Sequence, residues 1–159
     1  MTIQEELSAL QHFAEIGKRF QNTDLEHLDA PMAAFNYIRM ADSIAADRVR
    51  HNVAAPKLPF LDWGAGYGQI TWLLRSRGID AQGYNIEERE HISAIPELAA
   101  LKMTIDADPV KLPFADNSFS GVSSCGVLEH VPNPAGSLKE IHRVLAPGGR
   151  FYLFMLPQK

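Results

Sequence analysis

An aspartate stands two residues ahead of a loop that carries glycine at every second position. In the stretch LDWGAGYGQ, residues 61–69, Asp62 precedes Gly64, Gly66 and Gly68. Glycine adopts positive φ without steric cost and lets a ligand approach the backbone closely. A carboxylate beside such a loop attracts an ammonium or sulfonium group and repels a pyrophosphate. These residues therefore favour a nucleoside ligand whose end at this loop is a cationic amino acid.

The spacing of the glycines separates two ligand classes that use such a loop. A dinucleotide site has the spacing G-x-G-x-x-G, and counted from Gly64 this needs a glycine at the position of Gln69. Gln69 thus argues against a nicotinamide cofactor. A tight turn between a strand and a helix, with no ligand, is the other interpretation of the glycines.

Two further side chains could do chemistry. His130 follows Glu129, and because an imidazole titrates near neutral pH it could orient or deprotonate a hydroxyl or an amine. The alternative is a histidine satisfied by the backbone near a helix end. Cys125 lies in a small, apolar segment, where a thiol is usually inert rather than nucleophilic. The remaining histidines show no metal-ligand spacing, so we expect no metal; they are at positions 12, 27, 51, 91 and 142.

The elements that position these residues follow from the hydrophobic pattern. Apolar residues recur at helical spacing over residues 3–20 and again from Pro31 to about residue 49. From Lys57 onward short apolar runs alternate with amphipathic segments, which predicts a parallel sheet with right-handed crossovers. The predicted strands are 57–63, 80–85, 101–106, 119–127 and 150–156, and the predicted helices are 67–78, 87–95 and 134–145.

The composition excludes several function classes. The chain of 159 residues has a net charge of −4 and no stripe of Lys and Arg, which disfavours a nucleic-acid partner. A single cysteine fits a reducing compartment. The N-terminal stretch MTIQEELSAL is acidic and amphipathic, unlike a secretory signal. Because no apolar run reaches the roughly 18 residues of a membrane span, we expect a cytoplasmic protein without a membrane partner.

Motifs in a fixed order identify a family. The glycine loop is followed by DA at 106–107, LPF, SF, LEHV and RVLAPGG. Together these resemble the class I S-adenosylmethionine-dependent methyltransferases of the small-molecule type, over residues 58–156. The resemblance implies an α/β, Rossmann-like doubly wound sheet of five parallel strands in the order 3-2-1-4-5. It implies one compact domain with an N-terminal helical cap, residues 1–55, as a lid over a cofactor-binding core, residues 56–159.

The resemblance also implies a cofactor, a reaction and residue roles. S-adenosyl-L-methionine would donate its methyl group to a small-molecule acceptor, with His130 as the candidate catalytic residue. Its methionine part would be held by Asp62 and by the backbone of Gly64, Ala65 and Gly66. The remaining cofactor residues are Asn85 at the ribose, Ile86, Asp106 and Ala107 at the adenine, and Cys125, Gly126 and Val127 beneath the sulfonium.

Aromatic residues are candidates for the walls of the pocket. Phe13, Phe20, Phe35 and Tyr37 come from the lid, and each also fits a place in the core. Tyr67, within the glycine loop, is a candidate contact of the cofactor or the acceptor.

The chain departs from the family pattern at three places. Asn85 replaces the usual acid at the end of strand two, Ser120 replaces an aspartate after Phe119, and the final antiparallel hairpin of the family sheet is missing. Strand five would then be an apolar edge, residues 151–156, so we expect either a fragment of a longer protein or a homo-oligomer through that edge. A catalytically silent, methyltransferase-like binding or scaffold domain is the alternative function. The acceptor and its reacting atom cannot be read from these residues.

Overall fold

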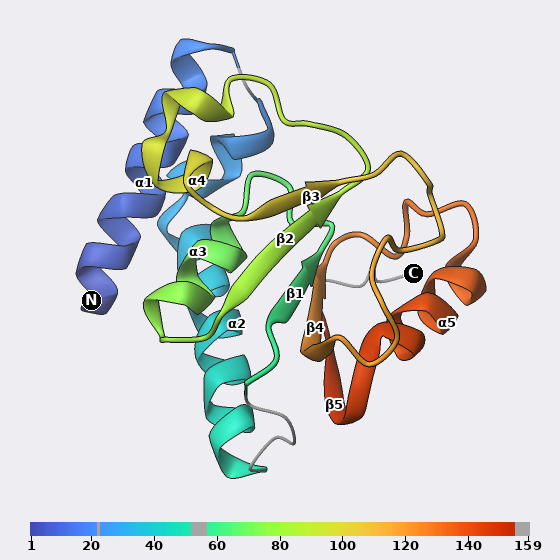
Figure 1. Cartoon of the computed structure of the whole chain (residues 1–159). Coiled ribbons are helices and arrows are strands. Elements are labelled where there is room, and N and C mark those ends of the chain that lie inside the picture. The colour runs from blue at the N-terminus through green and yellow to red at the C-terminus, as the bar shows by residue number, and fades with distance from the viewer. Residues whose placement is uncertain (22, 52–56, 155–159) are drawn as a thin grey trace.

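A five-stranded, all-parallel sheet forms the centre of the molecule (Figure 1), in a computed structural model that describes residues 1–21, 23–51 and 57–154. The strand order is β3-β2-β1-β4-β5, which confirms the predicted fold class and order. The strands are β1 Phe60–Trp63, β2 Ala81–Asn85, β3 Met103–Ile105, β4 Phe119–Cys125 and β5 Leu145–Phe154.

Helices cover both faces of the sheet (Figure 1). They are α1 Ile3–Arg19, η1 Thr23–Asp29, α2 Pro31–Arg50, α3 Gln69–Ser76, η2 Ile92–Ala94, α4 Pro96–Ala99 and α5 Pro134–Val144. Successive side chains of a strand point to opposite faces. Accordingly Phe60 packs in the hydrophobic cluster of α1, α2 and α3, whereas the next residue, Leu61, packs in the cluster of α5. The core therefore has two layers, one on each side of β1.

Local sequence signals explain where the helices begin. Thr2 and Glu5 form a capping box at the start of α1. Pro31 occupies the first turn of α2, where its missing N–H costs nothing. Asn133 caps α5 by accepting the N–H of Gly136. These three starts agree with the predicted ones.

The N-terminal helices are tied to the sheet by charged side chains. The Arg77 guanidinium, just after α3, contacts Glu6 of α1 at 2.8 Å and Asp42 of α2 at 2.7 Å. Asp47 of α2 accepts hydrogen bonds from Arg150 and Tyr152 of β5, both at 2.9 Å. The predicted cap boundary at residue 55 lies outside the described residues, so the division into cap and core stays a prediction.

The predicted helix over residues 87–95 is wrong. After β2 the chain instead forms an irregular turn, in which His91 has a φ of 58°, followed by the short η2 and α4. The Tyr67 hydroxyl donates to the carbonyl of Glu90 at 3.0 Å, so this tertiary contact holds the segment against the glycine loop. Pro96, the residue directly after the predicted helix, starts α4.

The start of the last strand also differs from the prediction. β5 begins at Leu145, directly after α5, and residues 146–149, which lie between the predicted helix and the predicted strand, form a shift of register within β5. Leu145 pairs with Phe119, and the regular pairing with β4 resumes at Arg150 opposite Gly121. Positions 155 and 156 of the predicted strand lie outside the described residues. β5 is an edge of the sheet in the described part of the chain, and pairing with a second copy along it stays a prediction.

Candidate functional site

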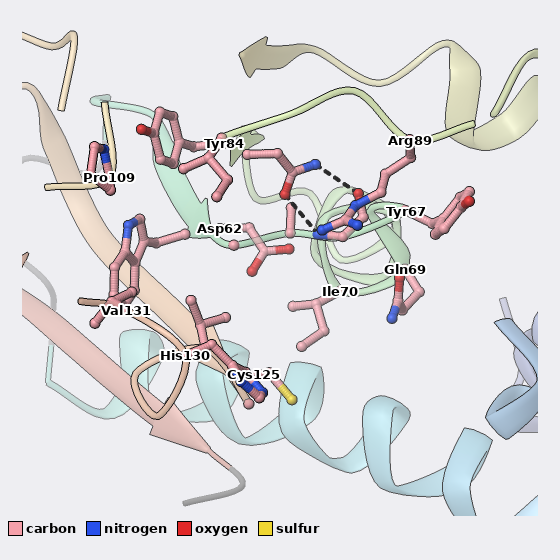
Figure 2. A pocket seen from close by; sticks show the side chains of 18 of the residues that line it. Asp62, Tyr67, Gln69, Ile70, Tyr84, Arg89, Pro109, Cys125, His130 and Val131 are labelled. Carbon is pink, nitrogen blue, oxygen red and sulfur yellow. Dashed lines mark hydrogen bonds between the residues drawn. The ribbon is translucent and has the colours of Figure 1, made fainter. Parts of the chain in front are cut away.

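A cavity of about 680 Å³ opens at the carboxyl ends of β1, β2 and β4. In doubly wound sheets this is the edge where ligands bind, and the volume falls in the range of small-molecule sites. Figure 2 shows Pro109 and Val131 at one end of the cavity and Tyr67 and Gln69 at the other.

Most of the predicted site residues meet in this cavity. Those that line it are Asp62, Gly64, Ala65, Gly66, Asn85, Ile86, Cys125, Gly126, Val127 and His130. Asp106 and Ala107 are not part of its lining; the Asp106 carboxylate instead accepts the N–H of Asp108 at 2.9 Å. The nearby Pro109 and Val110 do line it. The adenine-contact role of Asp106 and Ala107 therefore stays a prediction.

The glycine loop has the backbone conformation that its sequence indicated. Gly64, Gly66 and Gly68 have φ values of 71°, 59° and 92°. A Cβ on Gly64 would lie 2.4 Å from a methyl group of Val127, whereas a Cβ on Gly66 would meet no atom within 4 Å. The loop thus needs glycine for its path, and at Gly66 it leaves open space beside the main chain, which lets a ligand approach.

Asp62 is a buried carboxylate in the cavity wall, only 2% exposed. Its two oxygens accept the hydroxyls of Thr71 at 2.8 Å and Ser123 at 2.9 Å. Burial raises the pKa of Asp62 to about 6, and the two hydroxyls oppose that rise. A cation in the cavity would stabilise the charged carboxylate. The site therefore fits the cationic end of the expected cofactor.

Asn85 has a structural task that sequence reasoning missed. Its side-chain oxygen accepts the N–H of Gly66 at 2.9 Å, and its side-chain nitrogen donates to the carbonyl of Gly66 at 2.8 Å. The amide thereby holds the glycine loop at its middle residue. A carboxylate lacks the donor for the second bond, which explains physically why an amide suits this position. Contact with the ribose stays a prediction.

His130 and Cys125 line the same side of the cavity (Figure 2). The His130 side chain is 79% exposed, and its Nε2 lies 4.0 Å from a Glu129 oxygen. Burial raises the pKa of Cys125 to about 12, so the thiol stays protonated near neutral pH, as expected of an inert cysteine. The catalytic role of His130 stays a prediction.

Of the four aromatic residues expected at the pocket, only Tyr37 lines it. Phe13 packs edge-on against Trp72 at a centroid distance of 5.4 Å, and Phe20 stacks on His91 at 4.6 Å. Helical spacing alone does not separate a cavity wall from the core, because both are apolar faces.

Other cavity residues had little or no sequence signal. His27 reaches the cavity from η1, and Arg89 and Tyr67 reach it from the turn after β2 and from the glycine loop. Gln69 was noticed only as the residue that breaks the dinucleotide spacing, yet it also lines the cavity. In the described ranges 1–21, 23–51 and 57–154, no His, Cys, Asp and Glu side chains gather in a group that could hold a metal ion. Across those ranges no helix combines the length and hydrophobicity needed to cross a membrane.

Comparisons with known proteins agree on one family. A family model described as a methyltransferase domain matches residues 61–153, more than half of the chain. Sterol 24-C-methyltransferase ERG6B of Gibberella zeae is 31% identical over 160 residues, which cover 90% of this chain and 42% of that protein. The chain spans between 30% and 42% of the length of the first three curated relatives.

Solved structures share the fold. A candidate S-adenosyl-L-methionine-dependent methyltransferase of Methanococcus maripaludis aligns with a TM-score of 0.60 and 22% identity, covering 93% of this chain and 63% of that one. The [4+2]-cyclase SpnF aligns with a TM-score of 0.57 and 26% identity, covering 77% of this chain and 45% of that one.

Proposed function

Because the chain belongs to the class I S-adenosylmethionine-dependent methyltransferase family, we propose that it transfers a methyl group from this cofactor to a small-molecule acceptor. The family implies S-adenosylmethionine as the cofactor. The observation that carries the proposal is the position of Asp62, a buried carboxylate in the cavity wall beside three glycines of positive φ.

The residues present fit the cofactor. Asp62 would face its cationic methionine part, and the open main chain at Gly66 would let that part come close. Ile86, half exposed and lining the cavity, offers an apolar surface for the adenine. Bound S-adenosylmethionine would supply a methyl group on a sulfonium, which is an electrophile with a good leaving group.

The protein's part in such a reaction is mainly positioning. Holding two reactants in line can contribute on the order of 7–11 kcal/mol, so no catalytic triad or metal is required. Asn85 fixes the loop, and Asp62 is a buried part of the cavity wall. His130, exposed at the rim, would take a proton from the acceptor.

Calorimetric titration with S-adenosylmethionine and S-adenosylhomocysteine tests the cofactor site. We expect the wild type to bind both ligands, and Asp62→Asn to weaken that binding about tenfold because it removes the buried charge. Asp80→Asn is the matched control, since Asp80 is a surface carboxylate with 76% exposure that pairs with Arg75. If the wild type binds neither ligand, the proposal is wrong.

The acceptor class is part of the proposal. A sterol methyltransferase is among the relatives, and the cavity combines apolar residues such as Ile70 and Val127 with few charged ones. We expect an acceptor with a largely apolar body. Transfer of a labelled methyl group into an organic-solvent extract, from assays with candidate sterols and quinols, measures this directly.

A second candidate is a domain of this fold that does not transfer methyl groups. Two observations favour it: SpnF, a [4+2]-cyclase, shares the fold, and Asn85 replaces the usual acid and is bound to Gly66. Binding of S-adenosylhomocysteine without methyl transfer to any acceptor would favour this candidate, and measured turnover would exclude it.

A further inference from the structure

We propose that Tyr37, Gln69 and Cys125 form the acceptor subsite of the cavity, where the Gln69 side-chain oxygen accepts a hydrogen bond from an O–H or N–H group of the methyl acceptor. The inference rests on the proposed function and names the chemistry that its substrate must present. All three residues line the cavity.

The first observation is a buried polar atom that has no partner. Gln69 is only 9% exposed, and its Oε1 makes no hydrogen bond with any residue in the described part of the chain. Buried amide oxygens are nearly always paired, because leaving one unpaired is costly. Gln69 lies at the end of the cavity near Tyr67 (Figure 2). A ligand in the cavity can supply the missing donor.

The second observation fixes which end of the Gln69 amide is left over. A thioether sulfur only accepts, so the Cys125 thiol donates to the sulfur of Met40, 3.7 Å away. Tyr37 interacts with Cys125 and with the Gln69 side chain, and the interaction with Gln69 lowers the pKa of Tyr37, as a hydrogen-bond donor does. A donor on Gln69 can only be its side-chain nitrogen. The nitrogen is therefore the end that faces Tyr37, and the unpartnered oxygen is the atom that remains available.

Burial keeps this chain of hydrogen bonds in one protonation state. It raises the pKa of both Tyr37 and Cys125 to about 12, so neither group loses its proton near neutral pH. Both groups therefore keep their donor hydrogen before a ligand binds. A preorganised acceptor atom of this kind selects donors without any rearrangement.

Tyr37 comes from a different segment than the predicted cofactor residues, whereas Gln69 and Cys125 share their segment. Asp62 and the glycine loop belong to the segment matched by the family model, residues 61–153, whereas Tyr37 and the neighbouring His27 come from α2 and η1, which precede it. The wall beside Gln69 is thus built partly by a segment outside the match to the family model. Such a wall is suited to recognise the substrate that differs between members.

The surroundings also restrict the charge of the acceptor. The Asp62 carboxylate acts on Tyr37 and Cys125 and contributes to the raised pKa of each. The same field disfavours an anion at this end of the cavity. The expected acceptor therefore presents a neutral or cationic donor next to an apolar body, rather than a carboxylate or phosphate, at this position.

Two small probes test the subsite. They are 4-methylphenol and p-xylene, which differ by a hydroxyl in place of a methyl group, and their affinities are measured by ligand-observed NMR with S-adenosylhomocysteine at saturation. We expect the wild type to bind 4-methylphenol more tightly than p-xylene. In Gln69→Met the ratio of the two affinities should fall about fivefold, because methionine keeps the size of the side chain but removes the strong acceptor. Gln82→Met is the matched control: Gln82 of β2 has the same buried, unpartnered Oε1 but lies outside the cavity lining.

Several results would overturn the inference. One is an affinity ratio of 4-methylphenol to p-xylene that is unchanged in Gln69→Met, and another is a fall of this ratio in Gln82→Met equal to that in Gln69→Met. The third is that the wild type does not bind 4-methylphenol. A drop in affinity for S-adenosylhomocysteine in Gln69→Met, with unchanged affinity for 5′-methylthioadenosine, would assign the oxygen to the amino-acid end of the cofactor instead. If the wild type fails to bind S-adenosylhomocysteine, the proposed function fails, and the probe comparison without that ligand still decides whether Gln69 recognises a donor.

Discussion

Asp62 makes the stability of the protein depend on pH in an unusual direction. Its folded pKa of about 6 lies above the value of 3.8 for a free aspartate, because burial disfavours the charge. Between these values the folded state keeps a proton that the unfolded state has lost. The free energy of unfolding therefore decreases as the pH rises from about 4 to about 6, by on the order of 3 kcal/mol, and changes no further above that range.

Asp62→Asn should remove this decrease. The amide carries no charge and still offers hydrogen-bond partners to Thr71 and Ser123. Urea unfolding of both proteins across this pH range gives the difference in their free energies of unfolding, in which the effects of all other carboxylates cancel. We expect the free energy of unfolding of the variant, relative to that of the wild type, to increase by on the order of 3 kcal/mol as the pH rises from about 4 to about 7. A difference that stays constant with pH would contradict the argument.

Asn85→Asp should destabilise the protein even though it restores the family's usual acid. The carboxylate loses the donor to the carbonyl of Gly66 and places two acceptor oxygens against each other. The expected cost is about 1–3 kcal/mol in the free energy of unfolding at neutral pH, measured by urea denaturation. Asn117→Asp is the control, since Asn117 is exposed and outside the site. An unchanged stability would show that the bond to Gly66 contributes nothing.

For single residues, the sequence predicted which side chains lie at the site better than it predicted their hydrogen-bond partners. Asp62 and the three glycines could be placed because a strand end followed by closely spaced glycines allows few conformations. The partner of Asn85 could not be predicted, because the bond to Gly66 joins the end of β2 to the glycine loop, and only the pairing of β1 with β2 brings them together. The unpartnered oxygen of Gln69 depends in the same way on Tyr37, which is far from it in the sequence.

Among the elements, the glycine loop depends on the segment after β4. A Cβ at Gly64 meets Val127, whereas a Cβ at Gly66 meets nothing, although both residues have positive φ. Gly66→Ala should therefore cost only the backbone strain, about 1–2 kcal/mol, and Gly64→Ala should cost about 1–3 kcal/mol more through the clash.

A double-mutant cycle separates these two costs. Val127→Ala should recover the extra cost when combined with Gly64→Ala and recover nothing when combined with Gly66→Ala. Thermal or urea unfolding of the single and double variants supplies the free energies. Equal coupling for both glycines would mean that the packing against Val127 is not what sets the path of the loop.

The wrong helix over residues 87–95 has a clear cause. Residues 87–95 carry helical spacing, but the hydrogen bond from Tyr67 to Glu90 and the stacking of His91 on Phe20 hold them in an irregular turn. Tertiary contacts of this kind override local propensity. The parallel sheet, by contrast, follows from the alternation of strands and helices, and its strand order was implied by the resemblance to the family.

At the scale of the whole molecule, the N-terminal helices share one core with the sheet. Leu10 of α1, Ile38 of α2 and Phe60 of β1 belong to the same cluster of buried side chains. Glu6, only 4% exposed, pairs with Arg77 across this interface. Breaking a buried ion pair by removing one partner typically costs about 3–5 kcal/mol. The helices are therefore expected to unfold together with the sheet rather than separately.

The two tryptophans report on the two layers and test this expectation. Trp72 contacts Phe13 of α1, whereas Trp63 lies in the cluster of α5 on the other face of the sheet. In Trp63→Phe only Trp72 fluoresces, and in Trp72→Phe only Trp63 does. For each variant we expect the urea transition seen by fluorescence to coincide with its own transition seen by far-ultraviolet circular dichroism, as two-state unfolding requires. If the fluorescence transition of Trp63→Phe alone occurs at a lower urea concentration than its circular-dichroism transition, α1 detaches from the sheet before the rest unfolds. This is the behaviour of a separate cap.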